Sequence, residues 1–108
     1  METALVGYAM PIVIKKLKAL LDRLGFVVVG SKDKLPELQA FQNGNWFRSS
    51  RNIIFRFSKV EDNLTRIDIT ATIENNKNNR RAEEVIEEKI VSTIYQHFTT
   101  TRKLEYGI

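Results

Sequence analysis

The sequence predicts an α+β two-layer sandwich in which a four-stranded antiparallel meander carries two helices on one face, in the order α-β-β-β-β-α. Three observations lead to this fold class. Apolar residues recur with helical spacing near both ends of the chain, and in the middle they alternate with polar residues. An Asn-Gly dipeptide at residues 43–44 is a strong hairpin signal. A length of 108 residues suits a single domain, 1–108, in which segments 1–9 and 100–108 are expected to be loosely ordered.

The first predicted helix covers about residues 11–24 and is amphipathic. Its apolar residues fall within one arc of about 120°, and they are Met10, Val13, Ile14, Leu17, Leu20, Leu21 and Leu24. Pro11 suits the first helical position, where a missing N–H group costs nothing. Gly25 suits the left-handed residue that follows the last turn of a helix. The helix is therefore expected to bury one face and to end just before Gly25.

Two strands are expected after this helix. Residues 26–29 form a β-branched run that predicts a well-buried strand. Residues 35–42 form the next strand, which ends at the Asn-Gly dipeptide. A two-residue turn at this dipeptide pairs Phe41 directly with Trp46 on the return strand, a cross-strand aromatic contact.

The last two strands form the best-defined hairpin. Their odd-numbered apolar residues alternate with polar ones across 53–57 and 67–73. A three-residue loop at 61–63 brings the two apolar sets onto one face and sets Arg56 opposite Asp68. The odd-numbered apolar side chains of both strands are thus expected to face both helices.

The final helix is predicted over about residues 80–99. Its apolar stripe has a spacing of four residues and consists of Ala82, Ile86, Ile90, Ile94 and Phe98. A solvated acidic face is expected at Glu83, Glu84, Glu87 and Glu88. His97 lies near the predicted end of the helix, where the helix dipole favours its charged form.

Several classes of chemistry are excluded by composition. The chain has no cysteine, which excludes disulfides, thiolate metal sites and thiol nucleophiles, and its single histidine cannot build a multi-histidine metal site. The five glycines stand apart, so there is no phosphate-binding loop, and neither G-x-S-x-G nor H-E-x-x-H occurs. We therefore predict no catalytic residue, no cofactor, no metal site and no enzymatic activity.

The charge distribution bears on partners and location. Residues 1–60 carry ten basic and four acidic side chains, a net +6, whereas residues 61–108 carry −2. Such a basic half suits nucleic acid, anionic lipid or an acidic protein, and it also occurs by chance in many soluble domains. The longest charge-free run, Thr3 to Ile14, is too short to cross a bilayer, and no targeting segment is visible. A cytoplasmic location without membrane contact is expected.

The candidate partner-binding residues lie on or beside the middle hairpin, and they are Phe41, Trp46, Arg48, Arg51, Ile54 and Arg56. We interpret them first as a surface for a second copy or another protein, because apolar side chains on an open sheet face are often covered by a partner. The alternative is single-stranded nucleic-acid binding, in which the aromatic side chains stack on bases and the arginines hold phosphates.

A second alternative comes from architecture. The element order resembles small helix-grip folds, in which a long helix lies across a curved sheet, although no residue motif carries this resemblance. It implies a pocket for a small apolar ligand, lined by the inner isoleucines and phenylalanines. A filled core is the ordinary outcome at this chain length.

Overall fold

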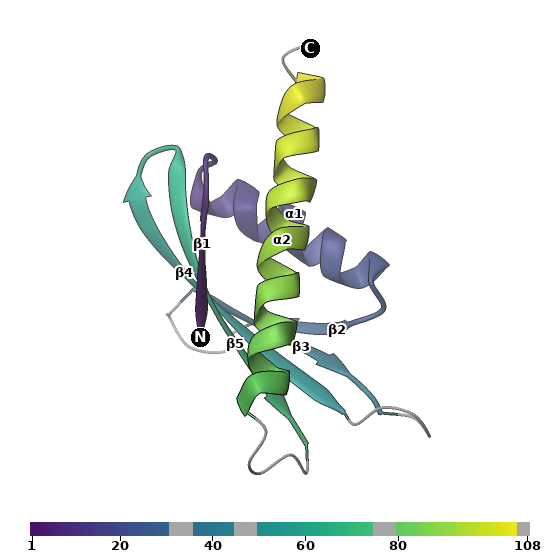
Figure 1. Ribbon diagram of the computed structural model, residues 1–108. Coiled ribbons are helices and arrows are strands. Elements are labelled where there is room, and N and C mark those ends of the chain that lie inside the picture. Colours follow the sequence, from purple (N-terminus) through teal and green to yellow (C-terminus); the bar gives the residue numbers. More distant parts are fainter. Residues whose placement is uncertain (31–35, 45–49, 75–79, 106–108) are drawn as a thin grey trace.

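The computed structural model describes residues 1–30, 36–44, 50–74 and 80–105, with side chains described as far as Phe98. The elements are β1 (Glu2–Val6), α1 (Met10–Arg23), β2 (Val27–Gly30), β3 (Glu37–Gln42), β4 (Arg51–Glu61), β5 (Leu64–Ile73) and α2 (Arg80–Glu105). The strands form one antiparallel sheet in the order β1-β5-β4-β3-β2 (Figure 1). The chain is thus an α+β domain with two helices in its described part.

Within the described residues the sheet has five strands: the predicted four-stranded meander is present as β2–β5, and β1 adds a strand that was not predicted. Residues 2–6, expected to be loosely ordered, pair with β5 and place β1 at the edge beside it. Ala4 and Val6 are buried, whereas Leu5 is exposed. This segment escaped prediction because its short run carries apolar residues on both faces and so shows no apolar–polar alternation.

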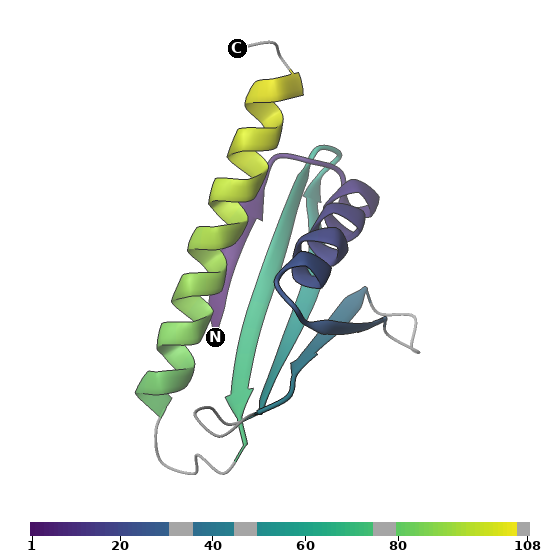
Figure 2. The ribbon, with the colours of Figure 1, turned by 90° about the vertical axis from the view of Figure 1, so that its right-hand side faces the viewer.

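Both helices lie on the same side of the curved sheet, which we call its inner face (Figure 2). Helix α1 contacts β2, β4 and β5, and helix α2 contacts β1 and β5. Their apolar residues join the odd-numbered residues of β4 and β5 in one buried cluster. Phe55 and Ile69 are completely buried, which confirms the predicted orientation of the last two strands.

The register of the last hairpin is confirmed along most of its length. Phe55 pairs with Ile69, and Arg56 pairs with Asp68. The tip differs, because the register shifts between Lys59 and Glu61 and Glu61 pairs with Leu64. This irregularity takes up one residue, so two residues close the hairpin where three were predicted.

The middle hairpin differs more from the prediction. Gln42 pairs with Arg51 and Phe41 pairs with Asn52, so the predicted two-residue turn and Phe41–Trp46 pair are wrong. The connection is wider and is closed by the backbone N–H of Gly44, which donates to the Ser50 Oγ at 2.9 Å. A side-chain acceptor at this position satisfies the turn without the tight pairing that an Asn-Gly dipeptide favours. Trp46 lies outside the described residues.

Helix α1 ends as its sequence predicts. Gly25 has a φ of 87°, in the left-handed region. Its N–H donates to the Asp22 carbonyl at 3.1 Å, and the N–H of Phe26 donates to the Leu21 carbonyl at 3.0 Å. These two bonds define a Schellman motif, which satisfies carbonyl groups at the helix end and turns the chain toward β2.

The two remaining elements also depart from expectation. Strand β2 was predicted to be well buried, but it is the outer edge of the sheet, and Val27 and Val29 are 63% and 43% exposed. A β-branched run predicts a strand and says nothing of the strand's place in the sheet. Helix α2 continues to Glu105, past the predicted end at residue 99, and its last turns project beyond the sheet (Figure 1).

Candidate interaction surface

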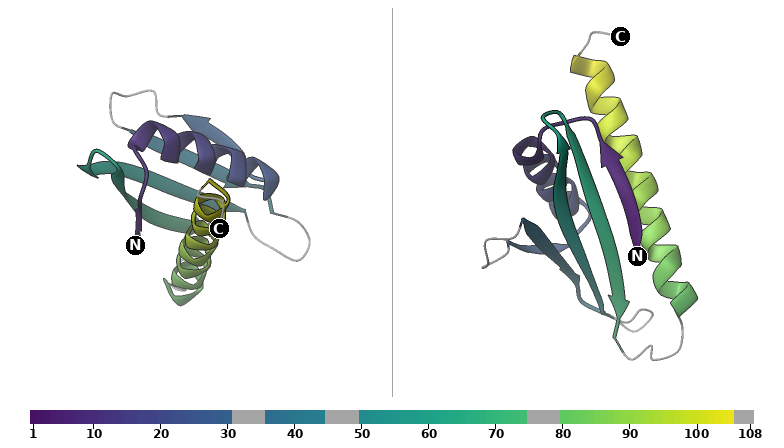
Figure 3. Two further views of the ribbon diagram at one scale, coloured as in Figure 1. Left: turned by 90° about the horizontal axis from the view of Figure 1, so that it is seen from above. Right: turned by 90° about the vertical axis from the view of Figure 1, so that its left-hand side faces the viewer.

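The described helices leave the outer face of the sheet, opposite them, uncovered. Figure 3 (right) shows the strands from this side with no helix in front of them. Strand alternation brings the even-numbered side chains of β4 and β5 to this face. The face is therefore available to a partner.

Four apolar side chains gather where the outer face meets the β2 edge, and we call them the outer apolar patch: Val27, Val29, Phe41 and Ile54. Val27 pairs directly with Phe41, and Val29 and Ile54 flank Gln39 in the next cross-strand row. Val27, Val29 and Phe41 are exposed, and Ile54 is half-buried. Contiguous apolar area of this kind is typical of a surface that a partner covers.

The charged side chains of the outer face are paired with one another. The register sets Arg56 between Glu37 of β3 and Asp68 of β5, and Arg56 Nε lies 3.0 Å from Glu37 Oε1. Asp68 accepts from the Thr3 hydroxyl at 2.9 Å and forms an ion pair with Arg66 at 3.0 Å. The positive charges of this face are thus largely balanced by neighbouring carboxylates.

The two edges of the sheet differ in how far α2 covers their backbone groups. At the β1 side, the backbone N–H of Leu5 donates to the Tyr95 hydroxyl of α2 at 3.0 Å. Beyond Glu2, the first residue of β1, which pairs with Ile69, α2 continues this protection along β5: Glu87 accepts the N–H of Ala71 at 2.8 Å, and Glu83 accepts that of Ile73 at 3.0 Å. Strand β2, at the other edge, pairs only with β3 within the described residues. The open edge of the sheet therefore adjoins the outer apolar patch.

The predicted acidic face of α2 is wrong for Glu87 and Glu83. Glu87 is completely buried and lies 2.9 Å from the Met1 amino group, and the side chain of Glu83 is 14% exposed. Glu88, at 50%, is exposed as predicted. The sequence does carry a signal for the burial of these two glutamates. Glu83 and Glu87 precede the buried Ile90 and Ile94 by seven residues, or two helical turns, and so lie on the same side of the helix.

The structure separates the predicted partner-binding residues. Phe41, Ile54 and Arg56 share the outer face, as the pairing of β3 with β4 requires. Arg51 has the parity of the buried Ile53 and turns to the inner side, where it lines a cavity. Trp46 and Arg48 lie outside the described residues. The valines of β2 belong to this surface and were missed, because their β-branched run was read as core.

The environment of His97 also differs from the prediction. The helix continues past it, so His97 does not sit at the C-terminal end of the helix dipole. Its Nδ1 lies 3.3 Å from Arg23 Nη2. Partial burial, and then the positive charges of Arg23 and Lys16, lower the pKa of His97 below its usual 6.5. The neutral imidazole is therefore the form that the fold favours.

This lowered pKa predicts a pH dependence of stability. The unfolded chain binds a proton at His97 at a higher pH than the folded chain does, so the contribution of His97 is complete above about pH 6.5 and is lost as the pH falls toward the folded-state pKa. We expect the free energy of unfolding to decrease over this range more in the wild-type chain than in His97→Gln. Urea denaturation at a series of pH values measures the difference. Parallel profiles for the two chains would contradict the prediction.

The described residues contain no group of three histidine, cysteine or acidic side chains that is placed to hold a metal ion. None of the helices in the described part of the chain is long and apolar enough to cross a bilayer. Comparison with known protein families, curated proteins and solved structures finds no match. The described residues thus define a fold class: a five-stranded antiparallel sheet with two helices on one face.

Proposed function

We propose that this protein is a non-enzymatic interaction domain that self-associates through the outer apolar patch and the adjoining β2 edge. The observation that carries the proposal is the position of the exposed valines of β2. They lie at the open edge of the sheet, while the opposite edge is covered by α2. Exposed β-branched edge strands readily pair with another chain.

A second copy suits this surface better than a partner of one charge sign. The outer face carries acidic and basic side chains side by side, as in the Arg56–Glu37 pair. A two-fold axis pairs such a face with a copy of itself, so acidic side chains of one chain can meet basic side chains of the other. The five described strands hold 36 residues in all. At about 3.3 Å per residue and about 4.8 Å between strands they give a flat face of roughly 600 Å², which is near the low end of the area that each partner of a stable dimer buries, about 600–1,000 Å².

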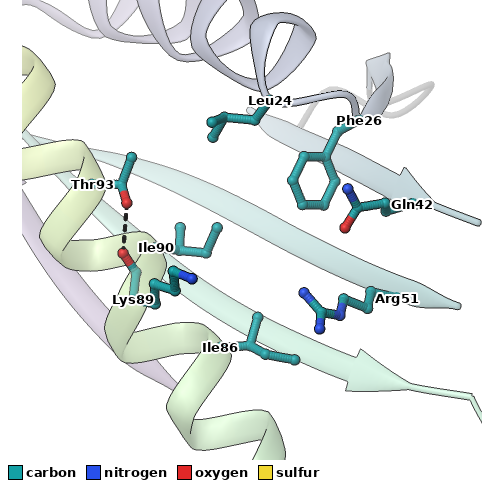
Figure 4. A pocket seen from close by; sticks show the side chains of 8 residues that line it. All are labelled: Leu24, Phe26, Gln42, Arg51, Ile86, Lys89, Ile90 and Thr93. Atoms are coloured by element: carbon teal, nitrogen blue, oxygen red, sulfur yellow. Dashed lines mark hydrogen bonds between the residues drawn. The ribbon is translucent and has the colours of Figure 1, made fainter. Parts of the chain in front are cut away.

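The ion pairs of the outer face count against the alternative of nucleic-acid binding. A phosphate contact at Arg56 or Arg66 competes with Glu37 or Asp68. Arg51 was also part of this alternative, but its side chain extends into the cavity on the inner side of the sheet (Figure 4). Nucleic-acid binding gains most of its affinity from unneutralised basic groups on one surface.

The proposal is tested by measuring the solution mass of the variant Ile54→Glu. We expect the wild-type chain to have twice its 12.5 kDa mass in light scattering and the variant to have the monomer mass. A buried, unpaired carboxylate costs about 3 kcal/mol or more in an interface, which weakens a dimer more than a hundredfold. Circular dichroism checks that the variant remains folded.

Ile12→Glu is the matched control. Ile12 is exposed on α1, on the other side of the sheet from the outer apolar patch. This variant introduces the same charge and is expected to remain a dimer. A wild-type chain that is monomeric at every concentration, or an Ile54→Glu chain that stays dimeric, would overturn the proposal.

A further inference from the structure

A cavity of about 210 Å³ lies on the inner side of the sheet, between the two helices (Figure 4). It is bounded by the end of α1, the start of β2, the ends of β3 and β4 that meet at the middle hairpin, and the first half of α2. Its apolar lining comes from four side chains: Leu24, Phe26, Ile86 and Ile90. The helices diverge here, so the core that fills the rest of the inner face leaves a space.

The charged side chains that line this cavity are both basic. Lys89 of α2 and Arg51 of β4 both extend into the space, and Gln42 of β3 lies beside Arg51 (Figure 4). None of the described residues that line the cavity is acidic. Two cations that face one volume repel each other, and an anion between them converts this repulsion into two charge-assisted contacts.

Lys89 differs in this respect from the two other basic residues of α2 whose side chains are described. Arg80 forms an ion pair with Glu83, and Arg81 forms one with Glu84. Within the described part of the chain, no carboxylate lies at ion-pair distance from the Lys89 ammonium group. Its charge therefore remains available to a group in the cavity.

We propose that this cavity binds a small carboxylate with a compact apolar body. The apolar walls at Phe26 and Ile90 receive the body, and the cations at Lys89 and Arg51 hold the carboxylate. The volume sets the size of the ligand: drug-sized ligands occupy about 300–1,000 Å³, whereas a dry cavity of about 150 Å³ holds benzene. One six-membered ring with a short carboxylate arm fits between these limits. The site lies on the opposite side of the sheet from the outer apolar patch, so its occupancy does not depend on self-association.

The test uses three probes of one shape and different charge: phenylacetate, neutral phenylacetamide and cationic 2-phenylethylamine. Calorimetric titration of the full chain measures affinity, and the NMR shifts of the Leu24, Ile86 and Ile90 methyl groups locate the site. We expect saturable binding of phenylacetate, binding of the amide that is at least about tenfold weaker, and no binding of the amine. Equal binding of phenylacetate and its amide, or no binding of phenylacetate, would overturn the proposal.

Two variants tie the binding to this cavity. Lys89→Gln removes the positive charge of an exposed side chain and keeps a polar end, and we expect it to weaken phenylacetate binding by about tenfold or more. Thr93→Phe fills the cavity from α2 and is expected to abolish binding. Lys18→Gln removes an exposed positive charge from α1, away from the cavity, and should leave the affinity unchanged. Undiminished binding in Lys89→Gln, or an equal loss in Lys18→Gln, would show that the cavity is not the site.

Discussion

Replacing Glu87 by alanine is expected to lower the free energy of unfolding by about 3–5 kcal/mol. The Glu87 carboxylate is completely buried, accepts the N–H of Ala71 at 2.8 Å, and lies 3.5 Å from Arg80 Nη2 and 2.9 Å from the Met1 amino group. The substitution leaves a buried backbone donor without an acceptor and opens a space under α2. An unsatisfied buried donor alone costs about 1–3 kcal/mol.

Two further variants separate the causes of this loss. Glu87→Gln keeps an acceptor of the same shape for the Ala71 N–H and removes only the charge, so its loss is expected to be smaller. Glu88→Ala removes a neighbouring exposed glutamate, and its effect should stay within about 0.5 kcal/mol. Urea denaturation followed by circular dichroism gives all three values. A loss for Glu87→Ala no larger than that for Glu88→Ala would contradict the proposed role of Glu87 at the sheet edge.

The position of Glu87 shows that a local sequence pattern does not predict contacts between a helix and a distant strand. The pattern of α2 correctly predicts a helix and its buried stripe at Ile90, Ile94 and Phe98. It does not reveal that β1 pairs with β5 only as far as Ile69, so that the backbone N–H groups of Ala71 and Ile73 face this helix. The seven-residue spacing from Glu87 to Ile94 indicates that Glu87 lies toward the buried side of α2, but its role as the acceptor for the Ala71 N–H follows only from the tertiary arrangement.

Elements with a strict period were predicted well. The alternation in β4 and β5 sets the face and register of the hairpin, because a slip of one residue would expose every isoleucine. The end of α1 at Gly25 also follows from local chemistry. Strand β1 and the place of β2 at the edge have no such signal, since strand order in a sheet depends on contacts between segments far apart in the chain.

The candidate surface was predicted in part for the same reason. Strand parity correctly places Ile54 and Arg56 on the outer face. The predicted tight turn after Phe41 led to a wrong cross-strand partner for this residue. The Asn-Gly signal is local, and the connection is wider and closed by Ser50. The cavity beside Lys89 needs the relative positions of two helices and three strands, which no pattern in the sequence specifies.

Phe55→Ala and Ile54→Ala, substitutions at adjacent positions of β4, are expected to differ widely in effect. Phe55 is completely buried at the centre of the sheet, between Leu38 and Ile69, and its truncation should cost about 3–5 kcal/mol. Ile54 lies half-buried on the outer face, and its truncation in dilute protein should cost less than about 1.5 kcal/mol. Urea denaturation at low protein concentration measures both, and equal losses would contradict the two-sided sheet.

The same pair of variants also distinguishes the monomer from the proposed dimer. Self-association stabilises the folded chain by mass action, so the loss for Ile54→Ala should increase as the protein concentration is raised. The loss for Phe55→Ala comes from the core of one chain and should increase much less, because Phe55 is already completely buried within a single chain. A loss for Ile54→Ala that does not change with concentration would mean that this face is not covered by a second copy.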